Sequence, residues 1–297
     1  MLEVPEHAVL PGTEERVSVM AADNRSARER DATAIYEDTA EPLTAQCVPS
    51  AFEMVGGISP GMAVLDVAAG PGGLSVRAAQ LGARVVATDI SAAMVARIQE
   101  RLAPYRHCAA AVMDAQAIDV ADTFDAAFSM FGVINLPGWR RGLRELVRVI
   151  RPGGYGCVSS WRDPRTVASV AILVEAMAEI FPDRETIPIP EGVRTAADPA
   201  ALQQEMSTAG FADVTVRAVP VTWECSSVET FVDGVDQSYG FMPVYLGLSA
   251  EDRGRLVPAL ARAAERRAGS DGVVRTLTTA HLAAGRVTTP QSGSSSS

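Results

Sequence analysis

The chain has 297 residues, of which 47% are hydrophobic, which is enough for a substantial core in one large or two small domains. Its 26 basic residues are outnumbered by 36 acidic ones, which gives a formal net charge of −10. So acidic a chain disfavours nucleic acid as a partner. All the basic residues are arginine, so no lysine can serve as a base or form a Schiff base.

The two ends of the chain differ from its middle. Residues 1–50 predict an N-terminal arm followed by lid helices, with the helical pattern of residues 26–56 broken near Pro42 and Pro49. The serine-rich residues 288–297 predict a disordered tail. No signal peptide or membrane span is evident, so we expect a cytoplasmic protein. The cysteines lack metal-ligand spacing, and no metal site is predicted: Cys47, Cys108, Cys157 and Cys225.

From residue 63 onward, short apolar runs alternate with helical patterns. The runs at 63–68, 84–88, 108–113, 124–130 and 155–161 predict five strands, with a turn at 151–154 before the last. Such alternation predicts a mostly parallel sheet with helices on both faces and a ligand site at the carboxyl ends of the strands. After residue 161 the pattern loosens, with helices predicted at 167–181, 198–210 and across 227–270, and strands at 214–225 and 273–287.

The loop VLDVAAGPGG, residues 64–73, follows the first predicted strand. Gly70, Gly72 and Gly73 would allow the backbone to approach a ligand closely. Asp66 lies within the strand, where a carboxylate would oppose a pyrophosphate but would suit a ligand that carries an ammonium and a sulfonium. The G-K-[ST] ending of a P-loop is absent.

Carboxylates also follow the next two strands. Asp89 ends the second strand, 19 residues after Gly70, where an acidic residue accepts hydrogen bonds from ribose hydroxyls. Asp114 follows the third strand and could accept a hydrogen bond from the amine of adenine. Met130, at the end of the fourth strand, would then lie beneath the cofactor, near its sulfonium.

These segments together resemble the class I S-adenosylmethionine-dependent methyltransferases. The resemblance rests on VLDVAAGPGG, ATDIS, MDAQAID, FDAAFSMFGVIN and LRELVRVIRPGGYGCVSS, and extends weakly to AGFADVTV. It is nearest to the small-molecule subgroup that includes the ubiquinone/menaquinone C-methyltransferases and natural-product enzymes. One departure is Ala68-Ala69, where relatives often carry Gly-Cys or Gly-Ser.

The resemblance implies a Rossmann-like sheet of seven strands, mostly parallel with the last antiparallel, in a domain spanning residues 51–287. Lid insertions would occupy about 163–197 and 227–272. It implies S-adenosylmethionine as cofactor, a small-molecule substrate, and a monomer or homodimer. The implied cofactor-binding residues are Tyr36, Asp66, Ala68, Gly70, Gly72, Asp89, Ile90, Met94, Asp114, Ala115 and Met130.

Several substrate classes of this superfamily do not fit the sequence. Nucleic-acid amines and protein glutamine need an Asn/Asp-Pro-Pro-aromatic motif where this chain reads SMFGVIN, cytosine C5 needs a Pro-Cys nucleophile, and metal-dependent catechol methylation typically needs a lysine. We therefore expect metal-independent methylation at O, N or C of a small, largely apolar metabolite, in secondary metabolism. A methyltransferase-like cyclase or isomerase that retains the cofactor is the alternative, and a nicotinamide-dependent reductase or a non-catalytic binding module is more remote.

The acceptor side of the site is less clearly marked in the sequence. His281 is a weak candidate base, since His7 and His107 lie in the arm and at a strand start. Apolar and polar side chains after the later strands and in the second insertion are the candidate substrate-binding residues: Phe131, Asn135, Trp161, Tyr239 and Phe241.

Overall fold

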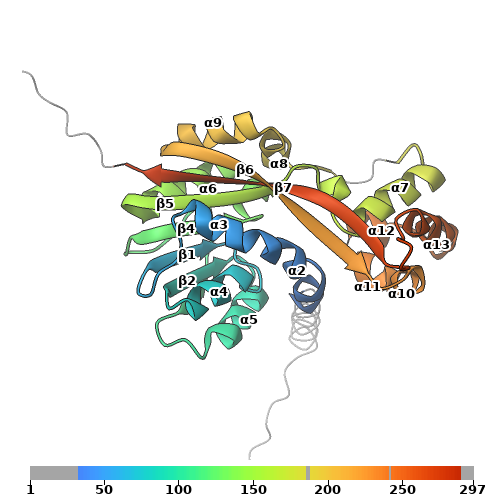
Figure 1. The fold of residues 1–297 in the computed structure, drawn as a ribbon, viewed down its shortest axis with the longest axis horizontal. Coiled ribbons are helices and arrows are strands. Elements are labelled where there is room, and N and C mark those ends of the chain that lie inside the picture. Colours follow the sequence, from blue (N-terminus) through green and yellow to red (C-terminus); the bar gives the residue numbers. More distant parts are fainter. Residues whose placement is uncertain (1–32, 185–187, 241, 289–297) are drawn as a thin grey trace, which may run out of the picture.

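A computed structural model describes residues 33–184, 188–240 and 242–288. Within these ranges seven strands form one sheet in the order β3-β2-β1-β4-β5-β7-β6 (Figure 1). Strands β1 to β5 are parallel to one another, whereas β7 is antiparallel to both β5 and β6. The predicted seven-stranded fold with an antiparallel last strand is confirmed. The strands are β1 Ala63–Val67, β2 Arg84–Asp89, β3 Ala109–Val112, β4 Phe124–Met130, β5 Ile150–Trp161, β6 Phe211–Cys225 and β7 Val274–Val287.

Helices flank the sheet and gather beyond one end of it. Residues 33–39 are helical and lead directly into α2. No helix in the described ranges is long and apolar enough to cross a membrane. The helices with printed bounds are α2 Glu41–Thr44, α3 Val48–Met54, α4 Gly73–Gln80, α5 Ala92–Leu102, α6 Trp139–Val149, α7 Val170–Ile180, α8 Glu191–Ala196, α9 Pro199–Ala209, α10 Val228–Asp233, α11 Val235–Tyr239, α12 Pro243–Leu246 and α13 Ala250–Glu265, with 3-10 turns η1 Ala45–Cys47, η2 Val133–Asn135 and η3 Pro164–Thr166.

The alternation of side chains along the strands divides the core between the two faces of the sheet. In β1, Val64 packs with α3, α4 and α5, whereas Leu65 and Val67 pack with α6, α8 and α9. Successive residues of a strand point to opposite faces, so Asp66 shares the face of Val64. This places a carboxylate against α4, directly beneath the loop that follows β1.

The expected breaks in the helical pattern near Pro42 and Pro49 are present, whereas one expected turn is not. The helix of residues 33–39 ends before α2, and the 3-10 turn η1 separates α2 from α3. Pro42 and Pro49 lie in the first turns of α2 and α3, where proline removes no helical hydrogen bond. The predicted turn at 151–154 lies inside β5, which begins at Ile150. Its register against β4 shifts between Phe124 and Ala126, and this irregularity absorbs the extra residues.

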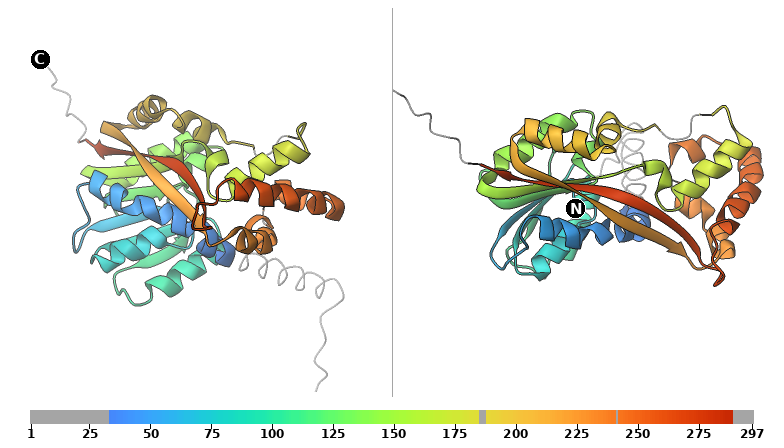
Figure 2. Two further views of the ribbon diagram at one scale, coloured as in Figure 1. Left: turned by 45° about the vertical axis from the view of Figure 1, so that its right-hand side comes forward. Right: turned by 45° about the horizontal axis from the view of Figure 1, so that its top comes forward.

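A separate apolar cluster lies at the far end of β6 and β7 (Figure 2). These two strands continue beyond the rest of the sheet and carry α7 and α10 to α13, which we call the helical cap. The residues predicted as the first lid insertion divide between two places. Helix α7 packs in the cap against α13, but α8 packs against the sheet through Val193 and Ala196.

Candidate cofactor site

The loop between β1 and α4 has an unusual backbone. Ala68, Gly70 and Gly72 all adopt positive φ values, of 54°, 57° and 91°. Glycine takes such angles freely, but alanine is strained there. Gly72 directly precedes α4, so the amino end of that helix opens onto the carboxyl edge of the sheet.

Asp89 is held at this edge by two backbone amides. The Gly70 N–H donates to its Oδ2 at 2.9 Å, and the Ser91 N–H donates to its Oδ1 at 3.0 Å. Each carboxylate oxygen can accept a further hydrogen bond. Asp89 therefore fixes the glycine loop and still offers acceptors to a ligand diol. The next residue, Ile90, is 71% exposed, and an exposed apolar side chain here suits a flat ring lying beside it.

Asp66 is almost fully buried, and its Oδ2 accepts a hydrogen bond from Ser75 Oγ at 2.7 Å. Burial raises the pKa of Asp66 to about 7, the Ser75 hydrogen bond opposes this, and the negative charges of Asp89 and Glu41 add to the rise. A cation bound nearby would stabilise the ionised form. Asp66 also borders a cavity of about 40 Å³, room for a few water molecules, together with Tyr36, Glu41 and Met130.

Tyr36 comes from the helical residues before α2 and lies over the glycine loop. A Cβ added to Gly70 would be 3.4 Å from its ring, at van der Waals distance, so the ring lies directly over this residue. Burial raises the pKa of Tyr36 to about 12, and the nearby carboxylates of Asp89 and Glu41 contribute. The phenol is therefore protonated at neutral pH and can donate a hydrogen bond.

The end of β3 supplies a third carboxylate. Asp114 is half-buried, and its Oδ1 accepts a hydrogen bond from the Gln116 N–H at 2.8 Å. Ala115 beside it is buried, and Met94 in the first turn of α5 is half-buried. Carboxylates thus stand in or directly after β1, β2 and β3, three neighbouring strands of the sheet.

The ends of β4 and β5 carry aromatic side chains. Phe131 has a φ of 56°, which is rare for a bulky residue, and its N–H donates to Ser159 Oγ at 3.0 Å. Its ring stacks on Trp161 with the centroids 4.2 Å apart. Asn135 is exposed, and its Nδ2 donates to the Phe131 carbonyl at 2.7 Å. Phe131, Asn135 and Trp161 therefore form one connected group.

Other residues that the sequence suggested have different contacts and do not join this group. Tyr239 is wholly buried in the helical cap, where its hydroxyl donates to the Ser169 carbonyl at 2.7 Å. His281 is buried beneath α8, and its Nδ1 lies 2.9 Å from the Ala196 carbonyl, which can accept but not donate. That contact fixes the proton of the neutral ring on Nδ1. Phe241 lies outside the described residues.

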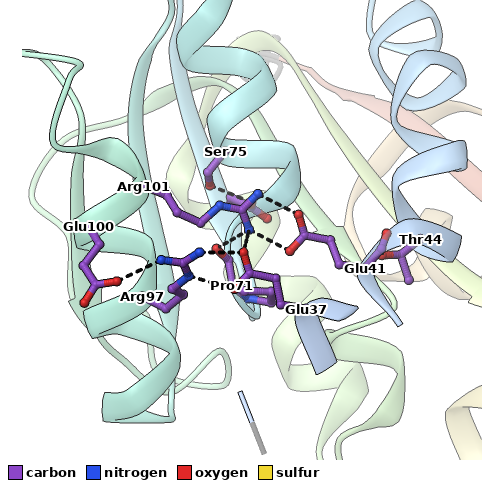
Figure 3. Close-up of polar contacts among 9 residues, drawn as sticks. Glu37, Glu41, Thr44, Pro71, Ser75, Arg97, Glu100 and Arg101 are labelled. Atoms are coloured by element: carbon purple, nitrogen blue, oxygen red, sulfur yellow. Dashed lines mark hydrogen bonds and ion pairs between the residues drawn. The ribbon is translucent and has the colours of Figure 1, made fainter. Parts of the chain in front are cut away.

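A group of ion pairs that the sequence did not predict lies beside the loop (Figure 3). Glu37 and Glu41 pair with Arg97 and Arg101 of α5, each at 2.7 Å. The two glutamates are four residues apart in the sequence, and so are the two arginines. This spacing places both glutamates on one helical face and both arginines on one face of α5. That matching spacing was a detectable signal, but the 60-residue separation concealed which acid meets which base.

The sequence also matches known proteins. A family model described as a methyltransferase domain matches residues 64–154. A demethylmenaquinone methyltransferase of Mycobacterium marinum is 35% identical over 167 residues, which cover 53% of this chain and 70% of that protein. The chain belongs to the class I S-adenosylmethionine-dependent methyltransferases. An uncharacterised protein of Mycobacterium tuberculosis H37Rv is 43% identical over 112 residues, but the match spans 35% of this chain and 39% of that relative.

Solved structures share the fold at low sequence identity. A candidate methyltransferase from Bacillus halodurans superposes with a TM-score of 0.53 at 14% identity, covering 82% of this chain and 99% of that one. The [4+2]-cyclase SpnF gives a TM-score of 0.50 at 19% identity and covers 82% of each chain. Enzymes of different chemistry therefore share this architecture, and these two likenesses establish the fold alone.

Proposed function

We propose that the chain binds S-adenosylmethionine and transfers its methyl group, without a metal ion, to O, N or C of a small, largely apolar metabolite in secondary metabolism. The observation that carries this proposal is the row of Asp66, Asp89 and Asp114 at one sheet edge, beside an exposed Ile90. Carboxylates suit hydroxyls, an amine and a cation, whereas they would repel a dinucleotide phosphate.

The site residues fit the parts of this cofactor. Asp89 would accept the ribose hydroxyls, Asp114 the adenine amine, and Ile90 and Met94 would contact the base. Asp66 would face the positive amino-acid end, and Tyr36 would cover it. Ala68, Gly70 and Gly72 shape the loop, and Ala115 would contact the adenine. The cofactor supplies an electrophilic methyl group, so the protein's task is to align the acceptor and exclude water.

The acceptor would lie against Met130, Phe131 and Trp161. The stacked rings offer an apolar wall after β4 and β5, and Asn135 offers a polar group beside it. The similarity to demethylmenaquinone methyltransferases supports a small, apolar acceptor. Tyr239 is a further candidate for substrate binding, and His281 is a candidate base. We also propose a cytoplasmic monomer or homodimer.

Isothermal titration of the full chain with S-adenosylmethionine tests cofactor binding. We expect Asp89→Ala to weaken binding by about 10- to 100-fold, because one side chain both anchors the loop and accepts ligand hydrogen bonds. Asp271→Ala is the control, since Asp271 is an exposed acid beyond the cap. Absence of heat at millimolar cofactor for the wild type would overturn the proposal.

Product mass distinguishes methyl transfer from the cyclase alternative. The wild type is incubated with apolar phenols, quinols and amines, and the masses of the products are measured by mass spectrometry. A gain of about 14 mass units, one CH₂, with stoichiometric S-adenosylhomocysteine supports transfer. Cofactor binding together with a product of unchanged mass would instead support a cyclase or isomerase that retains the cofactor.

A further inference from the structure

The residues that precede and form α2 are tied to α5 by two bidentate ion pairs (Figure 3). Arg97 donates through Nε and Nη2 to the two oxygens of Glu37, at 2.7 and 2.8 Å. Arg101 donates through Nη1 and Nη2 to the two oxygens of Glu41, at 2.7 and 2.8 Å. Two parallel hydrogen bonds per pair fix the relative orientation of the helices as well as their distance.

The Arg101–Glu41 pair differs from the surface ion pairs elsewhere in the described chain. The Arg101 and Glu41 side chains are 21% and 15% exposed, whereas Arg140 and Glu205, another bidentate pair, are 45% and 20% exposed. A partly desolvated pair is screened less by water and salt. The pair therefore has the means to hold two elements together, which exposed pairs generally lack.

Arg101 also contacts the glycine loop itself. Its Nη1 donates to the Pro71 carbonyl at 3.0 Å, and Pro71 lies between Gly70 and Gly72. On the other side of the loop, a Cβ on Gly73 would stand 2.7 Å from Glu41 Oε1. Gly73 thus makes room for Glu41, and the Tyr36 ring lies over Gly70. The loop is shaped to receive residues 33–44, which we call the N-terminal strap.

The far end of the strap is fixed separately. Gln46 in η1 donates to the Thr222 carbonyl of β6 at 2.9 Å and accepts from the Thr222 N–H at 3.1 Å. The chain is therefore anchored to the sheet directly after the strap, whereas Glu37 and Glu41 tie the strap itself to α5. Separation of the ion pairs would leave the anchor at Gln46 in place.

We propose that Arg101 is a positioning residue that joins the strap to the glycine loop, and that exchange of the cofactor requires the ion pairs to α5 to open. This inference rests on the proposed cofactor site, because the strap carries Tyr36 and Glu41 over Gly70 and Asp66. Arg101 acts through Glu41 and Pro71 and does not itself touch the reacting atoms.

The test measures the dissociation rate of S-adenosylhomocysteine from the full chain by stopped-flow displacement. Arg101→Gln should accelerate release by about tenfold or more. Arg101→Lys keeps the charge but loses the two parallel hydrogen bonds, and should fall between Arg101→Gln and the wild type. Arg140→Gln is the matched control, because it removes a bidentate ion pair between α6 and α9 that involves neither the glycine loop nor the strap.

A double-mutant cycle with Glu41→Gln asks whether the two residues act as one device. The double variant should release the product no faster than Arg101→Gln alone, and added salt should accelerate the wild type more than either variant. A release rate for Arg101→Gln within twofold of Arg140→Gln would overturn the proposal.

A second measurement needs no cofactor and keeps this inference separate from the proposed function. Hydrogen exchange of the free protein should show faster exchange for amides 33–44 in Arg101→Gln than in Arg140→Gln, with the sheet unchanged. Failure of the wild type to bind cofactor would overturn the proposed function. Unchanged exchange in the strap would overturn the ion-pair closure, whatever the cofactor result.

Discussion

Asp66 carries a carboxyl group that is almost fully buried within a strand, a position that apolar side chains usually occupy. Its pKa of about 7 lies above the value of an ordinary carboxyl, so the native state holds a proton between about pH 4 and 7 that the unfolded state has lost. The free energy of unfolding should therefore fall as pH rises through this window.

Urea denaturation of the free protein at several pH values checks this expectation. Asp66→Asn keeps an acceptor for Ser75 but cannot ionise, so its stability should lose that part of the pH dependence. Parallel curves of stability against pH for the two proteins from pH 4 to 7 would contradict the assignment.

The negative charge of ionised Asp66 also predicts that S-adenosylmethionine binds more tightly as pH rises through 7. Asp66→Asn should abolish this trend.

Ala68 is strained because alanine occupies a left-handed backbone position. Such a position costs an L-residue about 1–2 kcal/mol, while the greater freedom of glycine in the unfolded chain costs about 0.5–1 kcal/mol. Ala68→Gly should therefore raise the free energy of unfolding by about 0.5–1 kcal/mol. Ala69→Gly, its neighbour without a positive φ, should lower it by a similar amount, and equal losses for both variants would refute the strain argument.

At the scale of elements, the sequence predicted what depends on local pattern. The five strand ends that carry Asp66, Asp89, Asp114, Met130 and Trp161 follow from apolar runs and their spacing. Ser91 and Asp198 accept hydrogen bonds from the N–H groups of Met94 and Ala200, so residues close in sequence cap α5 and α9. These predictions succeed because hydrophobic periodicity and capping act within a few residues.

Features that depend on distant partners could not be predicted in the same way. Nothing near Glu41 in the sequence identifies Arg101 as its partner, and nothing near Asp89 shows that the distant Gly70 N–H donates to it. The division of residues 163–197 between cap and sheet likewise depends on which apolar surface each helix meets. Single-sequence patterns indicate that a face is apolar, not what covers it.

Tyr239 belongs to α11 and allows its two interpretations to be separated. Its hydroxyl donates to the Ser169 carbonyl inside the cap, and that carbonyl also accepts from the N–H groups of Ile172 and Leu173. Tyr239→Phe should therefore lower the free energy of unfolding by only about 0.5–1.5 kcal/mol, because one hydrogen bond is lost and the carbonyl stays paired. Tyr245→Phe should cost less, because its partner Asp236 is exposed. Loss of stability with an unchanged KM indicates a packing role, whereas a raised KM at unchanged stability would indicate substrate contact.

At the scale of the whole molecule, the helical cap has a core distinct from the cores on the two faces of the sheet. Such units often open separately from the rest of a protein. Leu260 of α13 and Leu143 of α6 are both fully buried, one in the cap and one against the sheet. Each Leu→Ala change should cost about 2–5 kcal/mol.

Hydrogen exchange should locate the two effects differently. Leu260→Ala should accelerate exchange in α7 and α10 to α13 and leave the sheet protected, with cofactor affinity nearly unchanged. Leu143→Ala should lower protection throughout the sheet. Uniform acceleration across the molecule in both variants would mean that cap and sheet unfold together.

Strands β6 and β7 stay hydrogen-bonded to each other from Phe211 and Val287 to Cys225 and Val274, so one ribbon serves both the sheet and the cap. A cap carried in this way does not swing about a flexible hinge, because its displacement would have to bend two strands that are hydrogen-bonded to each other. A larger opening of the molecule is then expected at a covering element that only side-chain contacts hold in place. By that criterion, the opening proposed for the strap beside α5, rather than a displacement of the cap, would admit small molecules to the cofactor site.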